Sequence, residues 1–387
     1  MTEARIDGAR GGTNEGSARQ GAGGEQVVLP LPRGGAGLAG VSPLPEAAWQ
    51  EALSHTEQPV LTQTPRWLRC VEAATSWRDS GRLYELRGGR FLAVPMASRG
   101  AGPVRLSASW PHGWGYGGVL ASDGVVTPAD LAVVGADLAA TPGLRTTLAP
   151  SPFAPLQGRA LPGARTEHRY LTQVLDLSGG TGGVWRGYSS NVRRSVKRAE
   201  REGVEVRCDA SGAGLPDFAH LYRLSAVRWA RKAGRPAALG RLQARLQEPP
   251  RLLEAVSRCV GQDLVTWNAY VDGRPAASVV ILHGNGHSLM WRGAQDQQLA
   301  GRTHANALLH HLAIEAAVAR GDRFYSFGES DAGSSLAEYK AKFGAVDLTW
   351  SASSFERLPV SAGGAAVQRA YRSAGGFAGR VRGRVRR

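Results

Sequence analysis

Three apolar runs joined by two tight turns constrain the fold of this chain more than any other feature. The runs are Leu264–Val271, Ala276–His283 and Ser288–Gly293, and the turns between them are Asp272-Gly273 and Gly284-Asn-Gly286. Short glycine-containing turns of this kind join neighbouring antiparallel strands. The pattern therefore predicts a three-stranded antiparallel meander.

The sequence after the meander predicts a crossover to a further strand. We expect a loop over Asp296–Thr303, and the apolar spacing of residues 304–320 predicts a helix. A strand is expected over Phe324–Phe327 and should stop at Gly328, before a short helix at residues 336–344. Ligands of open α/β sheets bind where strands end, so this segment is the first place to look for a site.

The loop before the helix has a spacing that suits phosphate. Its glutamine, glycine and threonine are arranged as Gln298-x-x-Gly301-x-Thr303. Backbone amides of such a loop, at the start of a helix, can hold a pyrophosphate. We therefore expect cofactor binding by Gln298, Gly301, Arg302 and Thr303, although so short a motif also arises by chance.

The first part of the chain predicts a separate set of elements. A helix is expected over residues 65–77, a hairpin over residues 82–96 and a helix over residues 127–140. Between them, Ser107–Gly118 is an aromatic and glycine-rich loop. Its glycines allow the backbone to approach a ligand or another domain closely, and a tight turn packed by tryptophans fits the same pattern.

A basic helix is expected in the second part, after a strand over residues 170–177. Six cations and one carboxylate lie between Arg186 and Arg201, and a cap at Ser190 or Asn191 should start the helix. A phosphate-bearing ligand or RNA would suit this face, and a solvated surface helix is the alternative. The substrate-binding candidates here are Ser190, Asn191, Arg193, Arg194 and Lys197.

Two more helices are expected over residues 216–234 and 251–260. The first should bury one face, formed by Phe218, Leu221, Tyr222, Ser225 and Trp229. The stretch from 203 to 262 contains no heptads, so it does not predict a coiled coil.

Composition favours two domains in one folded protein. The chain has 387 residues, of which 42% are hydrophobic and ten are tryptophan. We expect a disordered lead-in (1–40), an N-terminal domain (41–165), a C-terminal catalytic domain (166–356) and a basic, disordered tail (357–387). The tail holds eight arginines and no acidic residue, so it could contact RNA or an anionic membrane.

The cysteines do not predict secretion, and the apolar runs do not predict insertion into a membrane. Cys70, Cys208 and Cys259 are far apart and odd in number, so we expect no disulfide and no metal site. No apolar run is long enough to predict a transmembrane segment, which needs about 20 residues. We expect a cytoplasmic protein, with peripheral contact at the inner face of the membrane as an option.

The order of these elements resembles the FemAB-like superfamily of GNAT-fold acyltransferases over most of residues 45–355. The superfamily includes peptidoglycan-bridge aminoacyltransferases and acyltransferases of exopolysaccharide and cellulose loci. The matching motifs are Thr64–Trp67, Ser109–Gly118, Ser190–Arg194 with Lys197–Gly203, Phe327–Ser330 and Tyr339–Gly344. The resemblance implies tandem GNAT-like α/β domains, with mixed, mostly antiparallel sheets flanked by helices. Relatives often have Asp where this chain has Ser326, which puts a role for that carboxylate in doubt.

The resemblance also implies direct transfer of an acyl or aminoacyl group from a thioester or tRNA ester to an amine. Lys340 would stabilise negative charge, while Glu329 or His304 would take the proton of the amine. Trp291, Arg292, Ser330 and Tyr339 would line the substrate cleft. Each has a simpler alternative: Trp291 could be core, and Glu329 could merely pair with Lys340.

The donor is expected to be a co-substrate rather than a tightly bound cofactor. The absence of a coiled-coil arm favours acyl-CoA, with an amine on a small molecule, sugar or cell-envelope precursor as acceptor. The basic helix and tail favour aminoacyl-tRNA instead. A non-catalytic module that binds RNA or another polyanion is a third hypothesis.

Overall fold

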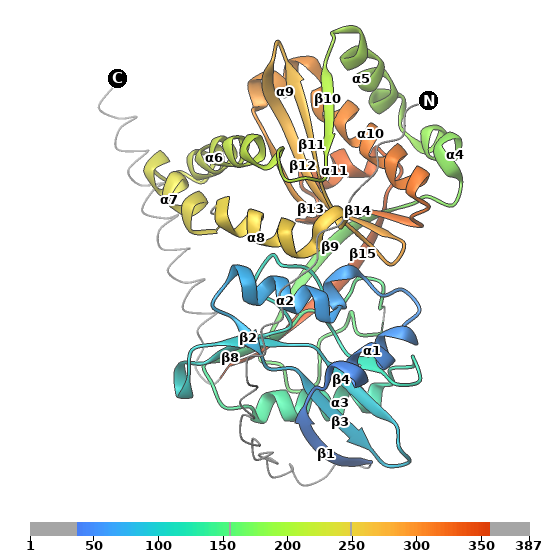
Figure 1. Ribbon diagram of the computed structural model, residues 1–387, viewed down its shortest axis with the longest axis vertical. Helices are drawn as coiled ribbons and strands as arrows, with labels where there is room; N and C mark the ends of the chain where they lie inside the picture. The colour runs from blue at the N-terminus through green and yellow to red at the C-terminus, as the bar shows by residue number, and fades with distance from the viewer. Residues whose placement is uncertain (1–36, 155, 248–249, 357–387) are drawn as a thin grey trace, which may run out of the picture.

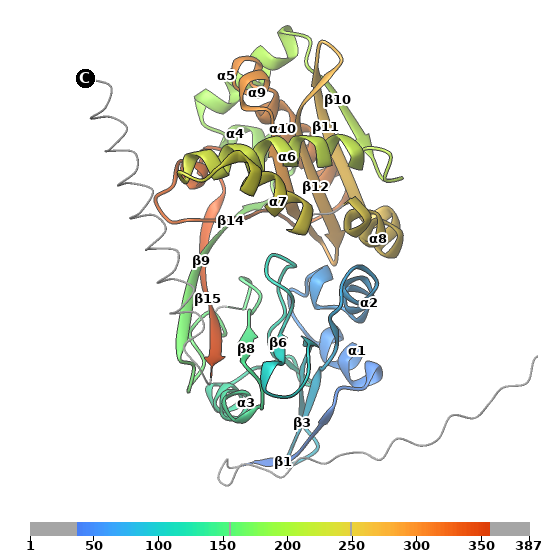
Figure 2. The same ribbon diagram turned by 90° about the vertical axis from the view of Figure 1, so that its left-hand side faces the viewer.

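The computed structural model describes residues 37–356, except for 155 and 248–249 (Figure 1). Most of the expected lead-in and the whole basic tail lie outside these residues. The chain forms two lobes, one from its first part and one from its second, with β9 and β15 running between them (Figures 1 and 2). In the part of the chain described, no helix is long and apolar enough to cross a membrane.

The first lobe is built around a small sheet with the strand order β1-β3-β4-β7. It confirms the expected helices near 65–77 and 127–140 and the hairpin, whose strands are β3 and β4. Strand β1 begins at Leu38, inside the expected lead-in. The elements of this lobe are β1 (Leu38–Pro43), α1 (Glu46–Ser54), α2 (Pro65–Ala74), β2 (Arg78–Asp79), β3 (Arg82–Leu86), β4 (Phe91–Val94), β5 (Ala97–Arg99), β6 (Leu106–Ala108), β7 (Leu120–Ala121), α3 (Pro128–Ala140) and β8 (Arg145–Leu148).

The second lobe contains the predicted meander, β11-β12-β13, and the basic helix, α5. Ser189, rather than Ser190 or Asn191, caps α5 by accepting the amide of Val192. The elements are β9 (Thr166–Asp176), α4 (Gly180–Gly187), α5 (Ser190–Arg201), β10 (Glu205–Asp209), α6 (Leu215–Lys232), α7 (Ala237–Gln247), α8 (Pro250–Val260), β11 (Leu264–Val271), β12 (Arg274–Gly284), β13 (His287–Gln295), α9 (Gln297–Thr303), α10 (Ala305–Arg320), β14 (Phe324–Ser330), α11 (Ser335–Ala341) and β15 (Val346–Glu356).

One large sheet joins the lobes, with the strand order β10-β11-β12-β13-β14-β9-β15-β8-β6-β5-β2. Side chains that alternate along β12 pack on its opposite faces. Val280 and Leu282 belong to a core shared with α6 and the first lobe, whereas Val279 and Ile281 pack with α10. The sheet therefore lies between α6 on one face and α10 on the other.

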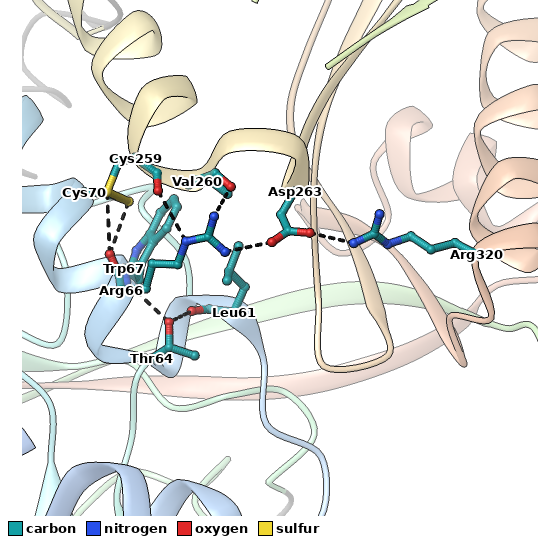
Figure 3. Close-up of polar contacts among 9 residues, drawn as sticks. All are labelled: Leu61, Thr64, Arg66, Trp67, Cys70, Cys259, Val260, Asp263 and Arg320. Atoms are coloured by element: carbon teal, nitrogen blue, oxygen red, sulfur yellow. Dashed lines mark hydrogen bonds and ion pairs between the residues drawn. A yellow bond between two sulfur atoms is a disulfide. The ribbon is translucent and has the colours of Figure 1, made fainter. Parts of the chain in front are cut away.

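Helices α2 and α8 bring the two lobes into contact (Figure 3). Arg66 of α2 donates hydrogen bonds to the carbonyls of Cys259 and Val260 and forms an ion pair of 2.7 Å with Asp263. The expectation of no disulfide is wrong, because Cys70 and Cys259 are joined across this contact, with 5.5 Å between their Cα atoms. The two cysteines are 189 residues apart, so their proximity depends on the tertiary fold and not on local spacing.

Candidate functional site

A cavity of about 900 Å³ lies where two parallel strands part. Strands β13 and β14 pair over His287–Leu289 and Phe324–Ser326, and both are irregular beyond that point. In β13, Trp291 is an extra residue opposite β12. In β14, the register with β9 shifts between Ser326 and Glu329. Bulges re-aim side chains and end pairing, which opens the space between the two strands.

Elements of both lobes form the walls of this cavity. The second lobe contributes Asn306 of α10, Tyr339 of α11 and Arg228 of α6. From the first lobe, Gly113 and Tyr116 of the aromatic loop face the same space. The loop is therefore packed by tryptophans and approaches the second lobe, and it also lines the cavity.

Glu329 supplies a carboxylate to the cavity. Its side chain is open to the space within, yet the protein around it removes enough bulk solvent to raise its pKa. The positive charges of Lys340 and Arg292 partly oppose that effect. A carboxylate with a raised pKa, held next to open space, is suited to accepting a proton.

Lys340 lies beside Glu329 and is 2% exposed. Its ammonium group donates hydrogen bonds to the carbonyls of Gly328, at 3.1 Å, and of Glu329, at 2.8 Å. Burial lowers the pKa of Lys340 to about 8, and the charge of Glu329 acts in the opposite direction. The lysine therefore fastens the end of β14 as well as placing a positive charge at the cavity.

The polar groups near the start of α10 also reach the cavity. His304 and Asn306 line it, and the Asn306 amide donates to the Tyr339 hydroxyl at 3.3 Å. Tyr339 is thus placed at the cavity, as the sequence suggested. His310 faces the same space, and its complete burial lowers its pKa to about 3, so the ring is neutral at physiological pH.

The segment Gln298–Thr303 is a helix, and the expectation of a loop is wrong. Asp296 caps α9 by accepting the amides of Gln298 and Leu299, which starts a helical turn before His304. The Thr303 hydroxyl donates to the Leu299 carbonyl, and the Arg302 guanidinium donates to that of Gln298. The helix uses these groups internally. Gly301 lines the cavity, and His304 has a left-handed backbone with φ of 55°, where α9 ends and α10 begins.

A second, basic groove of about 850 Å³ adjoins the cavity. Three of the substrate-binding candidates, Asn191, Arg194 and Lys197, line it together with Arg198 and Arg201. Ser195 and His304 line both spaces, so the groove and the cavity are neighbours. Positive charge therefore continues from α5 to the edge of the cavity.

Two predicted substrate-binding residues of this region have other partners. Arg193 donates hydrogen bonds to the carbonyls of Arg186 and Tyr188. Its guanidinium group therefore caps the C-terminal end of α4. Ser330 donates to the side-chain oxygen of Gln173 of β9 at 3.0 Å, so its hydroxyl is engaged within the protein. Ser190, exposed in the first turn of α5, is not among the residues that line the described cavity and groove.

Trp291 and Arg292 combine the two roles considered for them. Trp291 packs against Trp67 and Trp114 with ring centroids 5.6 Å away in each case, and both Trp291 and Arg292 line the cavity. The Trp291 indole and the Arg292 guanidinium each donate to the carbonyl of Gly113, at 3.1 and 2.7 Å. They therefore hold the loop of the first lobe over the site. Ser326 accepts the amide of Gly328, so it supports the bulge of β14.

Several residues of the cavity had no sequence signal. Arg228, Trp229 and Lys232 lie on α6, where the pattern predicted a buried Trp229, but this side chain is 43% exposed. Tyr116 and Asn306 are 190 residues apart in the sequence. The glycines of the loop 107–118 were the one hint that Tyr116 could be near a ligand.

Comparison with known proteins supports the fold of the second lobe. Residues 186–341 match the family model described as an acetyltransferase (GNAT) domain. The structure of FemX is similar, with a TM-score of 0.55 and 12% identity, over 81% of this chain and 97% of that chain. A tandem GNAT protein from the clavulanic acid biosynthesis pathway has a TM-score of 0.48 and 14% identity, over 82% of this chain and 98% of that one. Among curated proteins, no sequence match is found.

The fold and the family match identify residues 186–341 as a GNAT-type domain with mixed α/β structure. The similarity to FemX, at 12% identity, shows a shared fold.

Proposed function

We propose that the chain transfers an acyl group from an acyl-CoA thioester to an amine on a small molecule, a sugar or a cell-envelope precursor. The observation that carries the proposal is the parting of β13 and β14 around a cavity that holds the Glu329 carboxylate. Acceptor nitrogen and donor carbonyl must be held next to each other, and the cavity has room for both.

In the proposed reaction, the neutral amine attacks the carbonyl carbon of the thioester. Glu329 accepts the proton that the nitrogen loses, directly or through a water molecule. The C–N bond forms, the C–S bond breaks, and the thiol of CoA leaves after taking up one proton. No covalent enzyme intermediate is needed, so the site requires no nucleophilic side chain.

Lys340 has a positioning role in this proposal. Because its ammonium group holds the carbonyls of Gly328 and Glu329, it fixes the bulged end of β14 and the backbone from which Glu329 projects. Its charge also favours the ionised form of Glu329. His304 remains a lesser candidate for the base, since it lies at the edge of the cavity, where the basic groove begins.

The basic groove would hold the phosphates of the donor. Arg194 and Lys197 line it, and the first turn of α10 adds amides and the positive end of a helix dipole beside His304. The same charges suit the phosphodiester backbone of an aminoacyl-tRNA, which keeps a peptidoglycan-bridge aminoacyltransferase as the second candidate.

The place of the protein in the cell is part of the proposal. Acyl-CoA and charged tRNA are cytoplasmic, and the arginine-rich segment 357–387 could add contact with anionic lipid or RNA. The Cys70–Cys259 disulfide argues against a cytoplasmic place, because disulfides persist mainly in oxidising compartments. In the cytoplasm this pair would be a dithiol.

Donor binding and transfer are tested separately. The purified protein is heated with acetyl-CoA, longer acyl-CoA esters, CoA or charged tRNA, and its melting temperature is recorded. We expect a rise with acyl-CoA and a smaller rise with CoA. Radiolabelled donors are then incubated with amino sugars and amino acids, and acylated product is counted. Stabilisation by charged tRNA alone would favour the second candidate, and stabilisation by neither donor would contradict both.

A further inference from the structure

Helix α7 carries its large apolar side chains on the outside. Leu239, Leu242 and Leu246 are 41%, 51% and 73% exposed. At about 100° per residue, these three positions fall within roughly 60° of one another around the helix. They therefore form one continuous stripe, the α7 leucine stripe, that faces away from the protein.

The opposite side of α7 is built from small residues that pack on α6. Ala244 is 2% exposed, and Gly240 is so close that an added Cβ would lie 2.7 Å from the carbonyl oxygen of Ala226. The helix thus turns its smallest residues inward and its leucines outward, which is the reverse of the usual pattern of a soluble helix. Helix α6 and the outer helix α7 lie together on one side of the second lobe (Figure 2).

The helices that carry and flank the leucine stripe are rich in positive charge. From residue 218 to residue 247 the sequence has seven arginines and lysines and no aspartate or glutamate. Arg241 and Arg245 are on α7 itself, and both are exposed. Exposed leucines flanked by cations are the signature of a helix that lies in the interface of an anionic membrane.

We infer that α7 and the end of α6 bind the surface of a bilayer that contains anionic phospholipid. The leucines would enter the boundary between headgroups and acyl chains, while the arginines contact lipid phosphates. RNA would use the arginines but has no partner for three neighbouring leucines. A second copy of the chain would cover the leucines, but it would bring the same positive charge against this one.

This surface reaches the proposed active site. Trp229 and Lys232, near the end of α6, are exposed and also line the cavity. A protein resting on its leucine stripe would hold the edge of the cavity near the lipid surface. If the proposed function is correct, the favoured acceptor is an amine carried by a membrane-anchored molecule, but membrane binding itself does not depend on that function.

The test uses the full chain and two kinds of vesicle. The wild type is sedimented with phosphatidylcholine vesicles, either alone or mixed with phosphatidylglycerol. We expect binding to the mixed vesicles, and a loss of at least about tenfold in affinity for Leu239→Ser/Leu242→Ser/Leu246→Ser. The matched control replaces three apolar residues that are exposed elsewhere, Val104→Ser/Val125→Ser/Val346→Ser, and should bind as the wild type does. Circular dichroism checks that both variants fold.

A fluorescent probe at the leucine stripe distinguishes insertion of the leucines into the bilayer from electrostatic binding of the chain to its surface. An environment-sensitive dye on Leu242→Cys, with Cys208 replaced by Ala, should shift its emission to the blue on mixed vesicles, while the same dye on Val104→Cys should not. The inference is overturned if the wild type does not bind, if the leucine variant binds equally well, or if the dye does not respond. It is also overturned if the wild type is a dimer that the leucine variant converts to monomers, or if this variant loses binding to single-stranded RNA instead.

Discussion

The two lobes each contain a parallel pair of strands connected through a helix, but only one of these pairs is open. In the first lobe, β6 and β8 pair in parallel and α3 lies between them in the sequence. In the second, β13 and β14 pair in parallel and α10 lies between them. The same arrangement, two parallel strands connected through a helix, therefore occurs in both lobes. The two lobes differ in the segments that follow the paired residues.

Beyond β6 and β8 the chain closes the gap. The Ser109 amide donates to the Thr147 carbonyl, and Gly117 forms a parallel bridge with Pro150. Trp110, which is 4% exposed, packs nearby and donates to the Tyr116 carbonyl. The closing loop then projects Tyr116 to the cavity of the other lobe. The gap between two diverging parallel strands therefore remains a cavity in the second lobe, whereas in the first lobe the following loop fills it.

The largest expected effect comes from the open pair. Glu329→Gln removes the proposed base while preserving its shape, so kcat/KM should fall by about 100- to 1000-fold. Because the surrounding protein partly desolvates Glu329 and raises its pKa, the activity of the wild type should increase with pH as this group ionises, and the variant should lose that increase. Initial rates across pH are the measurement. Glu338→Gln, at an exposed position of α11, is the control, and equal losses in both variants would refute the role of Glu329.

Substitution at the closed strand pair, β6 and β8, should change the stability of the protein rather than its activity. Trp110→Ala removes a buried ring and should lower the free energy of unfolding by about 3–5 kcal/mol. Urea unfolding followed by circular dichroism measures this loss. Trp229→Ala, at a position that is 43% exposed, should change stability by no more than about 0.5 kcal/mol. An unchanged free energy of unfolding in Trp110→Ala would mean that the gap beyond β6 and β8 does not need the Trp110 ring.

A moderate effect is expected where Lys340 fastens the open end of β14. Its pKa of about 8 predicts that activity falls as pH rises through this value and the ammonium charge is lost. Lys340→Met should lack this decline and have a lower plateau, whereas Lys342→Met, at an exposed position, should keep the decline. The folded pKa lies below the ordinary 10.5, so Lys340 should also make the protein more stable as pH rises from about 8 toward 10.5. An unchanged alkaline profile in Lys340→Met would count against its role.

The smallest effect should come from the groove beside the open pair. Arg194→Ala/Lys197→Ala removes two exposed charges, so KM for the donor should rise by roughly tenfold with kcat little changed. The rise should shrink at high salt, because salt screens such charges. Arg87→Ala/Arg99→Ala removes two exposed cations from the first lobe and should leave KM unchanged. Steady-state kinetics at two salt concentrations would decide, and equal KM values for the two variants would exclude donor binding in the groove.

Local patterns in the sequence predicted much of the second lobe. The meander needs only glycine turns between apolar runs, and Glu329, Lys340 and Tyr339 lie close to the strand end from which they were predicted. The helix α9 was missed because Asp296 can cap a helix as readily as it can start a loop. Arg193 was assigned to a ligand because a sequence shows its charge but not the carbonyls of α4 that it caps. The disulfide and the place of Tyr116 depend on contacts between lobes, which no local pattern contains.

The large sheet pairs a strand that is synthesised late with one that is synthesised early. Strand β15 pairs with β8 over residues 353–356 and 145–148, so the first lobe receives one of its strands about two hundred residues after the neighbour of that strand. A ribosome will have made nearly all of the second lobe before β8 can be covered. While the chain emerges, the first lobe therefore presents an unpaired strand edge, which other chains or a chaperone can reach before β15 does.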